Sequence, residues 1–192
     1  MFGIRIHGRG GQGVVTAAEL LSVAAFLEGH HAQAFPSFGS ERTGAPVVAF
    51  CRIADHPIRT REPIAEPDAL IVQDVTLLRL PVLEGLRPGG FLLLNTARDP
   101  ALLGLRGAAE ALPPGHLRTV PATELSLEHV GRAVPNVPLL GAFAALTGLL
   151  SIDSVVAAIE DRFSGRTAHT NAAAARAAYR LVVEGVAHAP AG

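Results

Sequence analysis

The stretch IRIHGRGGQGVVTAAELLSVAAF, residues 4–26, decides the fold class of this chain. Its apolar start belongs to a strand expected over residues 2–7, and a helix is expected over residues 12–27. Between them lies a turn over residues 8–13 whose glycines have the spacing G-x-G-x-x-G. A strand, a glycine turn and a helix in this order form the opening unit of a phosphate-binding α/β fold.

This glycine turn allows two interpretations. Glycine permits a tight turn and the close approach of another group. The free N–H groups at the start of the next helix carry partial positive charge and attract an anion. The same glycines would also be needed if the turn only packed the helix on the sheet. The turn is therefore either an anion site or a purely structural element.

The sequence argues against two common ligands of such a turn. The chain has no lysine, so its sixteen basic residues are all arginine. A Walker A loop requires Lys and then Ser or Thr after its last glycine, where this chain has Val14 and Val15. NAD requires a carboxylate after the second strand, expected over residues 30–35, and none stands there. NADP stays open because Arg42 follows in the sequence.

Composition favours one globular domain that works beside other proteins. A length of 192 residues suits a single domain over residues 1–192. Hydrophobic residues make up 49% and charged residues only 17%, against about 25% in typical soluble chains. The mean hydropathy is +0.34. We therefore expect apolar surface that faces partner subunits.

Charge and segment length bear on the class of partner. A net charge of −1 gives no support for nucleic acid binding. No run reaches the roughly 18 uncharged apolar residues of a membrane span. Met1 leads almost directly into the first strand, so no signal peptide is expected and the predicted location is the cytoplasm.

Residues that could carry catalysis are scarce. The single Cys51 excludes a disulfide framework or a four-cysteine iron–sulfur cluster within this chain, and it is expected to be buried and inert. His7 ends the first strand without an evident partner, so we expect a structural histidine rather than a base. No nucleophile or metal-binding motif is present, and we expect no catalytic residue and no metal ligand in this chain.

The remaining pattern alternates strands with helices. Asp74 and Asn95 close two buried strands, where each either lines a crevice or caps the next turn; for Asp74 we favour the cap. Thr123 and Ser151 are expected to cap helices. Small residues such as Gly141 should allow close helix packing. Strands are expected at residues 47–53, 69–73, 91–94 and 117–121, and helices at 76–86, 100–112, 122–133, 139–150, 151–163 and 170–187.

The segment FPSFGSERTGAP, residues 35–46, is a loop with two phenylalanines. Surface loops rarely hold two aromatic residues without a contact to make. Glu41 and Arg42 are either a solvated ion pair or part of a recognition loop, in which Arg42 reaches a phosphate or a partner's carboxylate.

Together these motifs resemble the gamma subunit of 2-oxoacid:ferredoxin oxidoreductases of the pyruvate/ketoisovalerate type. The matching pieces are GRGGQGVVTAAELL (8–21), FPSFGSERTGAPVVAF (35–50), PDALIVQD (67–74), GGFLLLNT (89–96) and NVPLLGAFAALTGL (136–149). The resemblance implies the α/β class, as a Rossmann-like three-layer domain with a mostly parallel sheet and C-terminal helices at about residues 136–192.

The resemblance also implies a function. Such enzymes oxidatively decarboxylate a 2-oxoacid to acyl-coenzyme A and reduce ferredoxin, with thiamine diphosphate, Mg²⁺ and [4Fe–4S] clusters. The implied partners are alpha, beta and delta-type subunits, which would hold those groups, while this chain alone would bind none. Its implied coenzyme A or phosphate contacts are Gly8, Arg9, Gly10, Gly11, Gln12, Gly13, Phe38, Gly39, Glu41, Arg42 and Asn95.

A second function of another class stays open. The glycine turn would also suit a free-standing module that binds NADP or another nucleotide.

Overall fold

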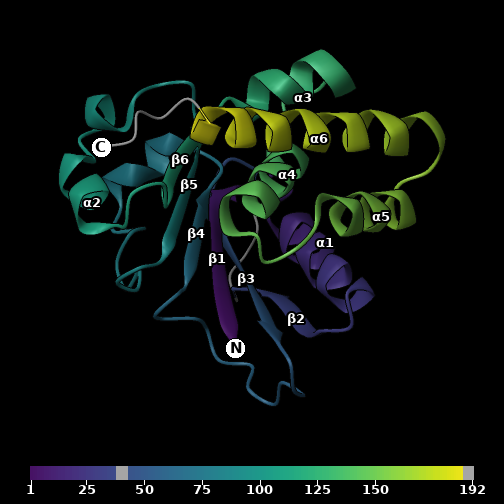
Figure 1. The fold of residues 1–192 in the computed structure, drawn as a ribbon, viewed down its shortest axis with the longest axis horizontal. Coiled ribbons are helices and arrows are strands. Elements are labelled where there is room, and N and C mark those ends of the chain that lie inside the picture. The colour runs from purple at the N-terminus through teal and green to yellow at the C-terminus, as the bar shows by residue number, and fades with distance from the viewer. Residues whose placement is uncertain (38–42, 188–192) are drawn as a thin grey trace.

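The computed structural model describes residues 1–37 and 43–187, which form one sheet with helices packed on it (Figure 1). The six strands stand in the order β2-β3-β1-β4-β5-β6. The strands are β1 (Phe2–Arg9), β2 (His31–Pro36), β3 (Pro46–Ala54), β4 (Ala69–Val72), β5 (Phe91–Asn95) and β6 (Leu117–Val120). The helices are α1 (Val14–Leu27), α2 (Arg106–Ala111), α3 (Ala122–Val130), α4 (Asn136–Thr147), α5 (Ile152–Arg162) and α6 (Gly165–Ala187), with the 3₁₀ helices η1 (Val75–Arg79) and η2 (Pro100–Leu103).

The sheet is mostly parallel, as predicted. β1, β4, β5 and β6 pair in parallel, and β3 lies antiparallel between β1 and β2. β4 and β5 are apolar runs, the pattern typical of parallel strands covered on both faces. Only residues 37–45 join β2 to β3, and that connection is too short for the helical crossover that a parallel neighbour requires.

Helices and turns cover both faces of the sheet, so the predicted three layers are confirmed. Ile71 and Leu93 belong to a core that includes side chains of α1, α4, α5 and α6. Leu70 and Leu92 point to a second core with η1 and residues around α2. α1 contacts β1, β2 and β3 of the sheet and also α4 and α5, which explains why its sequence has only a thin polar stripe.

A close contact between α4 and α6 depends on Gly141 in α4. A Cβ atom at this position would lie 1.9 Å from the carbonyl oxygen of Ala175 in α6. The prediction that small residues allow close packing is confirmed here. Gly148 has a different role, because it ends α4 with a left-handed φ of 62°.

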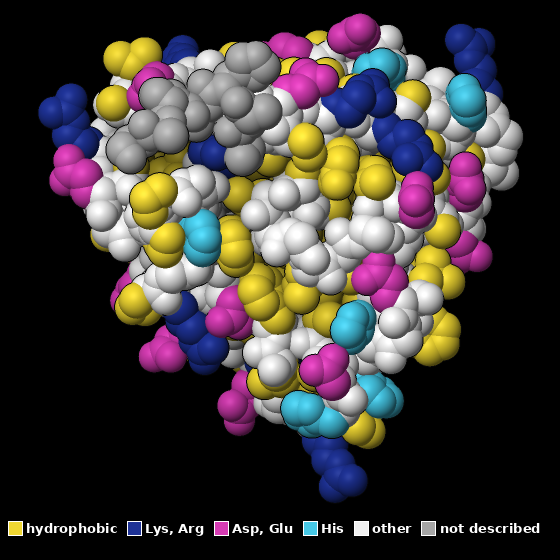
Figure 2. Space-filling view, in the orientation of Figure 1, with side chains coloured by type: hydrophobic (Ala, Val, Ile, Leu, Met, Phe, Trp, Pro, Cys, Tyr) yellow, Lys and Arg dark blue, Asp and Glu magenta, His cyan; other side chains and the backbone are white. Residues whose placement is uncertain are grey.

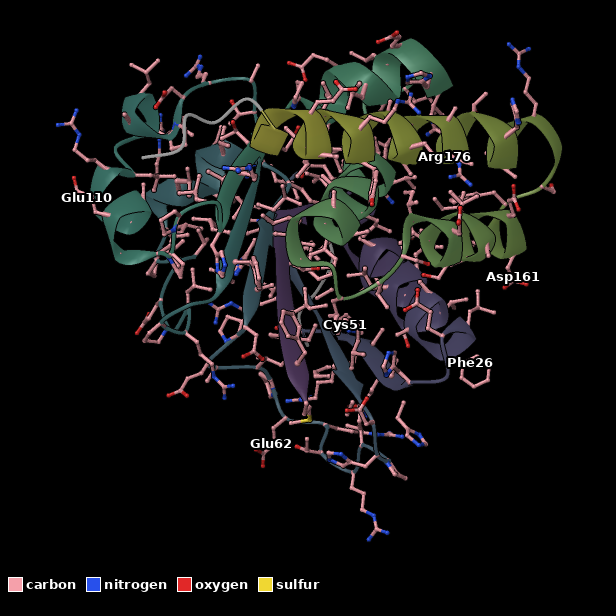
Figure 3. All side chains as sticks on the ribbon, in the orientation of Figure 1. Phe26, Cys51, Glu62, Glu110, Asp161 and Arg176 are labelled. Carbon is pink, nitrogen blue, oxygen red and sulfur yellow. The ribbon has the colours of Figure 1, made fainter. Side chains whose placement is uncertain are left out.

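Side chains from three elements fix the start of α5. The Ser151 hydroxyl accepts a hydrogen bond from the Ser154 N–H at 3.1 Å, which confirms the predicted cap. The Glu28 carboxylate at the end of α1 accepts from the Ser151 N–H at 2.8 Å. Arg176 of α6 points toward α5 and donates to Asp153 at 3.0 Å (Figure 3).

Three predicted boundaries are wrong for reasons of local chemistry. The helix expected at 76–86 is only η1, because Leu80 precedes Pro81 and adopts an extended conformation. α4 begins at Asn136 rather than at 139, since Pro138 fits within a first helical turn. The helix expected at 100–112 is split in two by Gly104, whose φ is 74°.

The predicted Thr123 cap is also wrong. Pro121 occupies the N-cap position of α3 and makes no cap bond, and the Thr123 N–H in the first turn donates to Oδ1 of Asn95. Thr123 lies one residue inside and bonds to Asn95 instead. α3 ends at Val130, before the left-handed Gly131, rather than at residue 133.

Other boundaries moved by a few residues. β1 continues to Arg9, α1 starts at Val14 after the left-handed Gly13, and α6 starts at Gly165 rather than at 170. Cys51 is fully buried as predicted, and burial raises its pKa to about 12. None of the helices within residues 1–37 and 43–187 is both long and apolar enough to cross a membrane.

Candidate functional site

The glycine turn joins the end of β1 to α1 and is hydrogen-bonded to the segment before β3. The Gly10 N–H donates to the Ala45 carbonyl at 2.9 Å, and the Gly10 carbonyl accepts from the Gly44 N–H at 3.1 Å. The Gln12 N–H closes the turn on the Arg9 carbonyl at 3.0 Å. The turn therefore has a defined shape set by backbone hydrogen bonds.

Two glycines of the motif are required by the packing of the chain itself. A Cβ at Gly8 would lie 2.5 Å from Cγ2 of Val14. Gly13 has a φ of +70°, and a Cβ there would lie 2.3 Å from Nδ2 of Asn136. The structural interpretation of the glycines therefore accounts for these two positions.

Gly11 differs from both. Its φ is +95°, it is exposed, and a Cβ there would meet no atom of the described residues within 4 Å. Within residues 1–37 and 43–187, no atom fills the space beside Gly11.

Arg9 is fixed by hydrogen bonds from its guanidinium group to other residues of the chain. Its guanidinium donates to the Asp74 carboxylate at 3.0 Å, to the Gly44 carbonyl at 3.0 Å and to the Thr76 hydroxyl at 2.7 Å. Its backbone N–H donates to Oε1 of Gln12 at 2.8 Å. The charge of Arg9 is therefore matched by a carboxylate within the chain.

Asp74 links the turn to the end of β4. It accepts from the Thr76 N–H at 3.0 Å, which confirms its predicted capping role, and from Nε2 of Gln12 at 3.3 Å. Burial alone would raise the pKa of Asp74, but hydrogen bonds from Thr76 and Gln12 and the charge of Arg9 outweigh it. The pKa therefore lies below its usual value, and the carboxylate stays ionised beside Arg9.

Both N–H groups and the oxygen of the Asn95 side chain form hydrogen bonds, to Gln73 after β4 and to Thr123 of α3. Its Nδ2 donates to the Gln73 carbonyl and to the Thr123 hydroxyl, both at 2.8 Å, and its Oδ1 accepts from the Thr123 N–H at 3.1 Å. The side-chain amide of Asn95 is therefore bonded to groups of its own chain rather than directed at a ligand.

His7 is buried and neutral. Arg5 donates from Nε to Nε2 of His7 at 3.0 Å. Burial, followed by the charge of Arg5, lowers the pKa of His7 to about 4. The remaining donors of Arg5 bond to backbone carbonyls, including those of Ile64 and Ala65. The predicted structural role of His7 is thus confirmed.

Sequence reasoning missed two residues beside the turn. Asn136 donates from Nδ2 to the Gly13 carbonyl at 3.3 Å. Gln73 is 1% exposed, and neither polar atom of its side chain has a hydrogen-bond partner within the described residues. The position of Gln73 directly after the buried strand β4 could have identified it as a residue beside the turn. Its oxygen lies 3.0 Å from where a Cβ at Gly8 would stand.

The open space around the turn forms two hollows. The small hollow, about 320 Å³, is lined by Arg9, Gly10, Gly11, Gly13, Val14, Val15, Thr16 and Val47. A larger one of about 590 Å³ shares Gly11, Gly13 and Thr16 with it. The first turn of α1 thus borders both. The predicted contacts Phe38, Gly39, Glu41 and Arg42 lie outside the described residues.

Comparisons with known proteins agree on one family. The family model described as pyruvate ferredoxin/flavodoxin oxidoreductase matches residues 3–181. The common gamma subunit of pyruvate/ketoisovalerate oxidoreductases from Thermococcus litoralis is 48% identical over 186 residues, 95% of this chain and 98% of that protein. Pyruvate synthase subunit PorC from Methanothermobacter marburgensis is 48% identical over 93% of this chain and 96% of its own length.

A solved structure gives the same answer. The crystal structure of pyruvate oxidoreductase subunit PORC from Thermotoga maritima is similar with a TM-score of 0.79 and 36% identity, over 93% of this chain and 95% of that one. These proteins confirm the resemblance that the sequence motifs indicated. The chain belongs to the pyruvate ferredoxin/flavodoxin oxidoreductase family.

Proposed function

We propose that this chain is the gamma subunit of a multi-subunit 2-oxoacid:ferredoxin oxidoreductase, which decarboxylates a 2-oxoacid, forms acyl-coenzyme A and reduces ferredoxin. The observation that carries the proposal is the 48% identity to a gamma subunit over nearly the whole length of both chains. The partners are alpha, beta and delta-type subunits, and the complex works in the cytoplasm. The chain is one domain over residues 1–192.

The redox and thiamine chemistry is assigned to the partner subunits. A [4Fe–4S] cluster is held by four cysteine thiolates, and this chain has one cysteine, which is buried. Thiamine diphosphate, with Mg²⁺, would supply the carbanion stabilisation that decarboxylation needs. This chain contributes the surface on which coenzyme A is held.

The coenzyme A contact is proposed at the first turn of α1, beside Gly11. Among the described residues no side chain caps α1, and no acidic residue stands in its first turn. Its first N–H groups are therefore available to an anion such as the diphosphate of coenzyme A. The small hollow gives that anion room. Arg9, matched by Asp74, and Asn95 would shape the site rather than carry its charge.

The topology speaks against a free-standing NADP module. In a dinucleotide-binding fold the second strand runs parallel beside the first, and the ribose lies at its end. Here the antiparallel β3 stands beside β1, and β2 lies at the edge of the sheet. The relatives are oxidoreductase subunits as well.

Purification from native cells through an affinity tag on this chain tests the proposal. We expect larger subunits to co-purify with iron, thiamine diphosphate and 2-oxoacid-dependent reduction of ferredoxin that requires coenzyme A. A tagged chain that purifies alone, while the oxidoreductase activity stays in the unbound fraction, would contradict it.

A further inference from the structure

The larger hollow beside the glycine turn is lined by arginine. It has a volume of about 590 Å³ and lies between the first turn of α1, the end of α3 and the start of α6. Arg132, Arg162 and Arg166 line it, and we name it the arginine hollow after them. All three arginines are exposed. This volume is within the range of sites that bind small molecules.

Its net charge is positive. Glu128 is the acidic residue among the described lining residues, against three guanidinium groups. Within residues 1–37 and 43–187 none of these three arginines forms an ion pair, whereas Arg9 and Arg176 each pair with a carboxylate. Arg162 lies over the Phe163 ring, 5.7 Å from its centroid. The carboxylates of the described residues therefore leave the charge of the arginine hollow unmatched.

Helix ends of both signs meet at the arginine hollow. α1, α4 and α6 begin there, and α3 and α5 end beside it. The positive ends outnumber the negative ones, so the helix dipoles do not oppose the positive charge of the three arginines. A guanidinium suits a phosphate because it donates two parallel hydrogen bonds.

We propose that the arginine hollow binds the 3′-phosphate of coenzyme A. The inference rests on the proposed function, which places the diphosphate of the same molecule at the first turn of α1. Gly11, Gly13 and Thr16 line both hollows, so one ligand can enter both. Coenzyme A carries a second anionic group on its ribose, close to its diphosphate, and the arginine hollow supplies the matching charge. Phe163 adds an apolar ring to the same lining.

Dephospho-coenzyme A, which lacks only the 3′-phosphate, provides the test. Affinities of both ligands are measured for the assembled complex carrying this chain as wild type or as Arg132→Gln/Arg166→Gln. We expect the double variant to bind coenzyme A about tenfold more weakly, a modest effect for exposed charges, and to bind dephospho-coenzyme A within twofold of wild type. Arg180→Gln, which removes one positive charge from an exposed arginine of α6 outside the lining, is the control and should change neither affinity.

The outcomes separate this inference from the proposed function. Equal weakening of both ligands by the arginine variant, or no weakening of either, overturns the 3′-phosphate site. If Gly11→Asp still weakens both ligands in that case, the proposed coenzyme A contact stands without the inference. If the arginine variant instead fails to assemble with its partners, the arginine hollow is a docking surface for an acidic protein segment, and the inference is overturned.

Discussion

Asn136, the first residue of α4, occupies the space where a side chain at Gly13 would be. Its Nδ2 donates to the Gly13 carbonyl at 3.3 Å, and a Cβ at position 13 would lie 2.3 Å from that nitrogen. The last glycine of the motif is thus explained by contact with a helix far along the chain. Within one glycine motif, Gly13 is thus required by packing of the chain, whereas we propose that Gly11 is required for ligand contact.

Gly13→Ala is expected to destabilise the chain by about 2–4 kcal/mol, from left-handed backbone strain together with overpacking against Asn136. Gly11→Ala is the matched control, because it has a left-handed φ as well but meets nothing within 4 Å. It should cost about 1 kcal/mol. Denaturant unfolding of both variants measures the difference, and equal losses would show that Asn136 moves aside without cost.

Gly141→Ala should loosen the packing of α4 on α6. Since the added carbon would lie 1.9 Å from the Ala175 carbonyl oxygen, the helices must separate, at a cost of about 2 kcal/mol or more. Gly185→Ala, in an open part of α6, is the control and should stabilise the chain by about 0.5–1 kcal/mol. Thermal unfolding of both variants checks the opposite signs, and a stable Gly141→Ala protein would refute the close approach.

Stability should fall between pH 6.5 and pH 4 because of His7. Its pKa falls from 6.5 to about 4 on folding, so over this range the unfolded chain binds the proton more readily than the folded one. Stability is therefore greatest above pH 6.5 and is lost as the pH falls, by up to about 3 kcal/mol from this group.

His7→Gln keeps an acceptor for Arg5 and removes the titration. The free energy of unfolding of this variant, measured by urea denaturation between pH 4 and 7, should depend less steeply on pH than that of wild type. An unchanged slope would mean that His7 is not the group that titrates.

Apolar surface remains for partner subunits. Hydrophobic side chains extend across the middle of the face drawn in Figure 2. Phe26 is 72% exposed and points outward at the end of α1 (Figure 3). Phe26→Ser is expected to weaken assembly of the complex by about 1–2 kcal/mol and to leave the stability of the chain unchanged. Sedimentation of the reconstituted complex measures this, and unaltered assembly would place the interface elsewhere.

The fold could be predicted from local patterns, because a strand that is buried on both faces of the sheet has a continuous apolar sequence. The apolar run at β4 and the glycine turn before α1 need no knowledge of distant residues. The antiparallel β3 was not predicted, because its direction depends on how residues 37–45 connect it to β2. The helix predicted at residues 76–86 was too long for a related reason: Pro81 forces Leu80 into an extended conformation and ends η1 at Arg79.

The site could be predicted only in part. Residues 8–13 were identified from spacing, yet the contacts of Arg9 with Asp74 and of Gly13 with Asn136 arise from tertiary packing. The arginine hollow brings together residues from α1, α3, α4, α5 and α6, and no sequence spacing connects them. Because of the Asn136 contact, Gly13→Asp would disrupt α4 as well as any anion site, so Gly11 is the better probe.

The affinity of the assembled complex for coenzyme A, compared between Gly11→Asp and Gly11→Asn, tests the central claim most directly. The two side chains have similar size and share the cost of a left-handed backbone, so they differ chiefly by one negative charge beside the first turn of α1. The account predicts that Gly11→Asp binds coenzyme A at least tenfold more weakly than Gly11→Asn, because the carboxylate repels the diphosphate. Equal affinities in the two assembled variants would contradict a coenzyme A contact at the glycine turn.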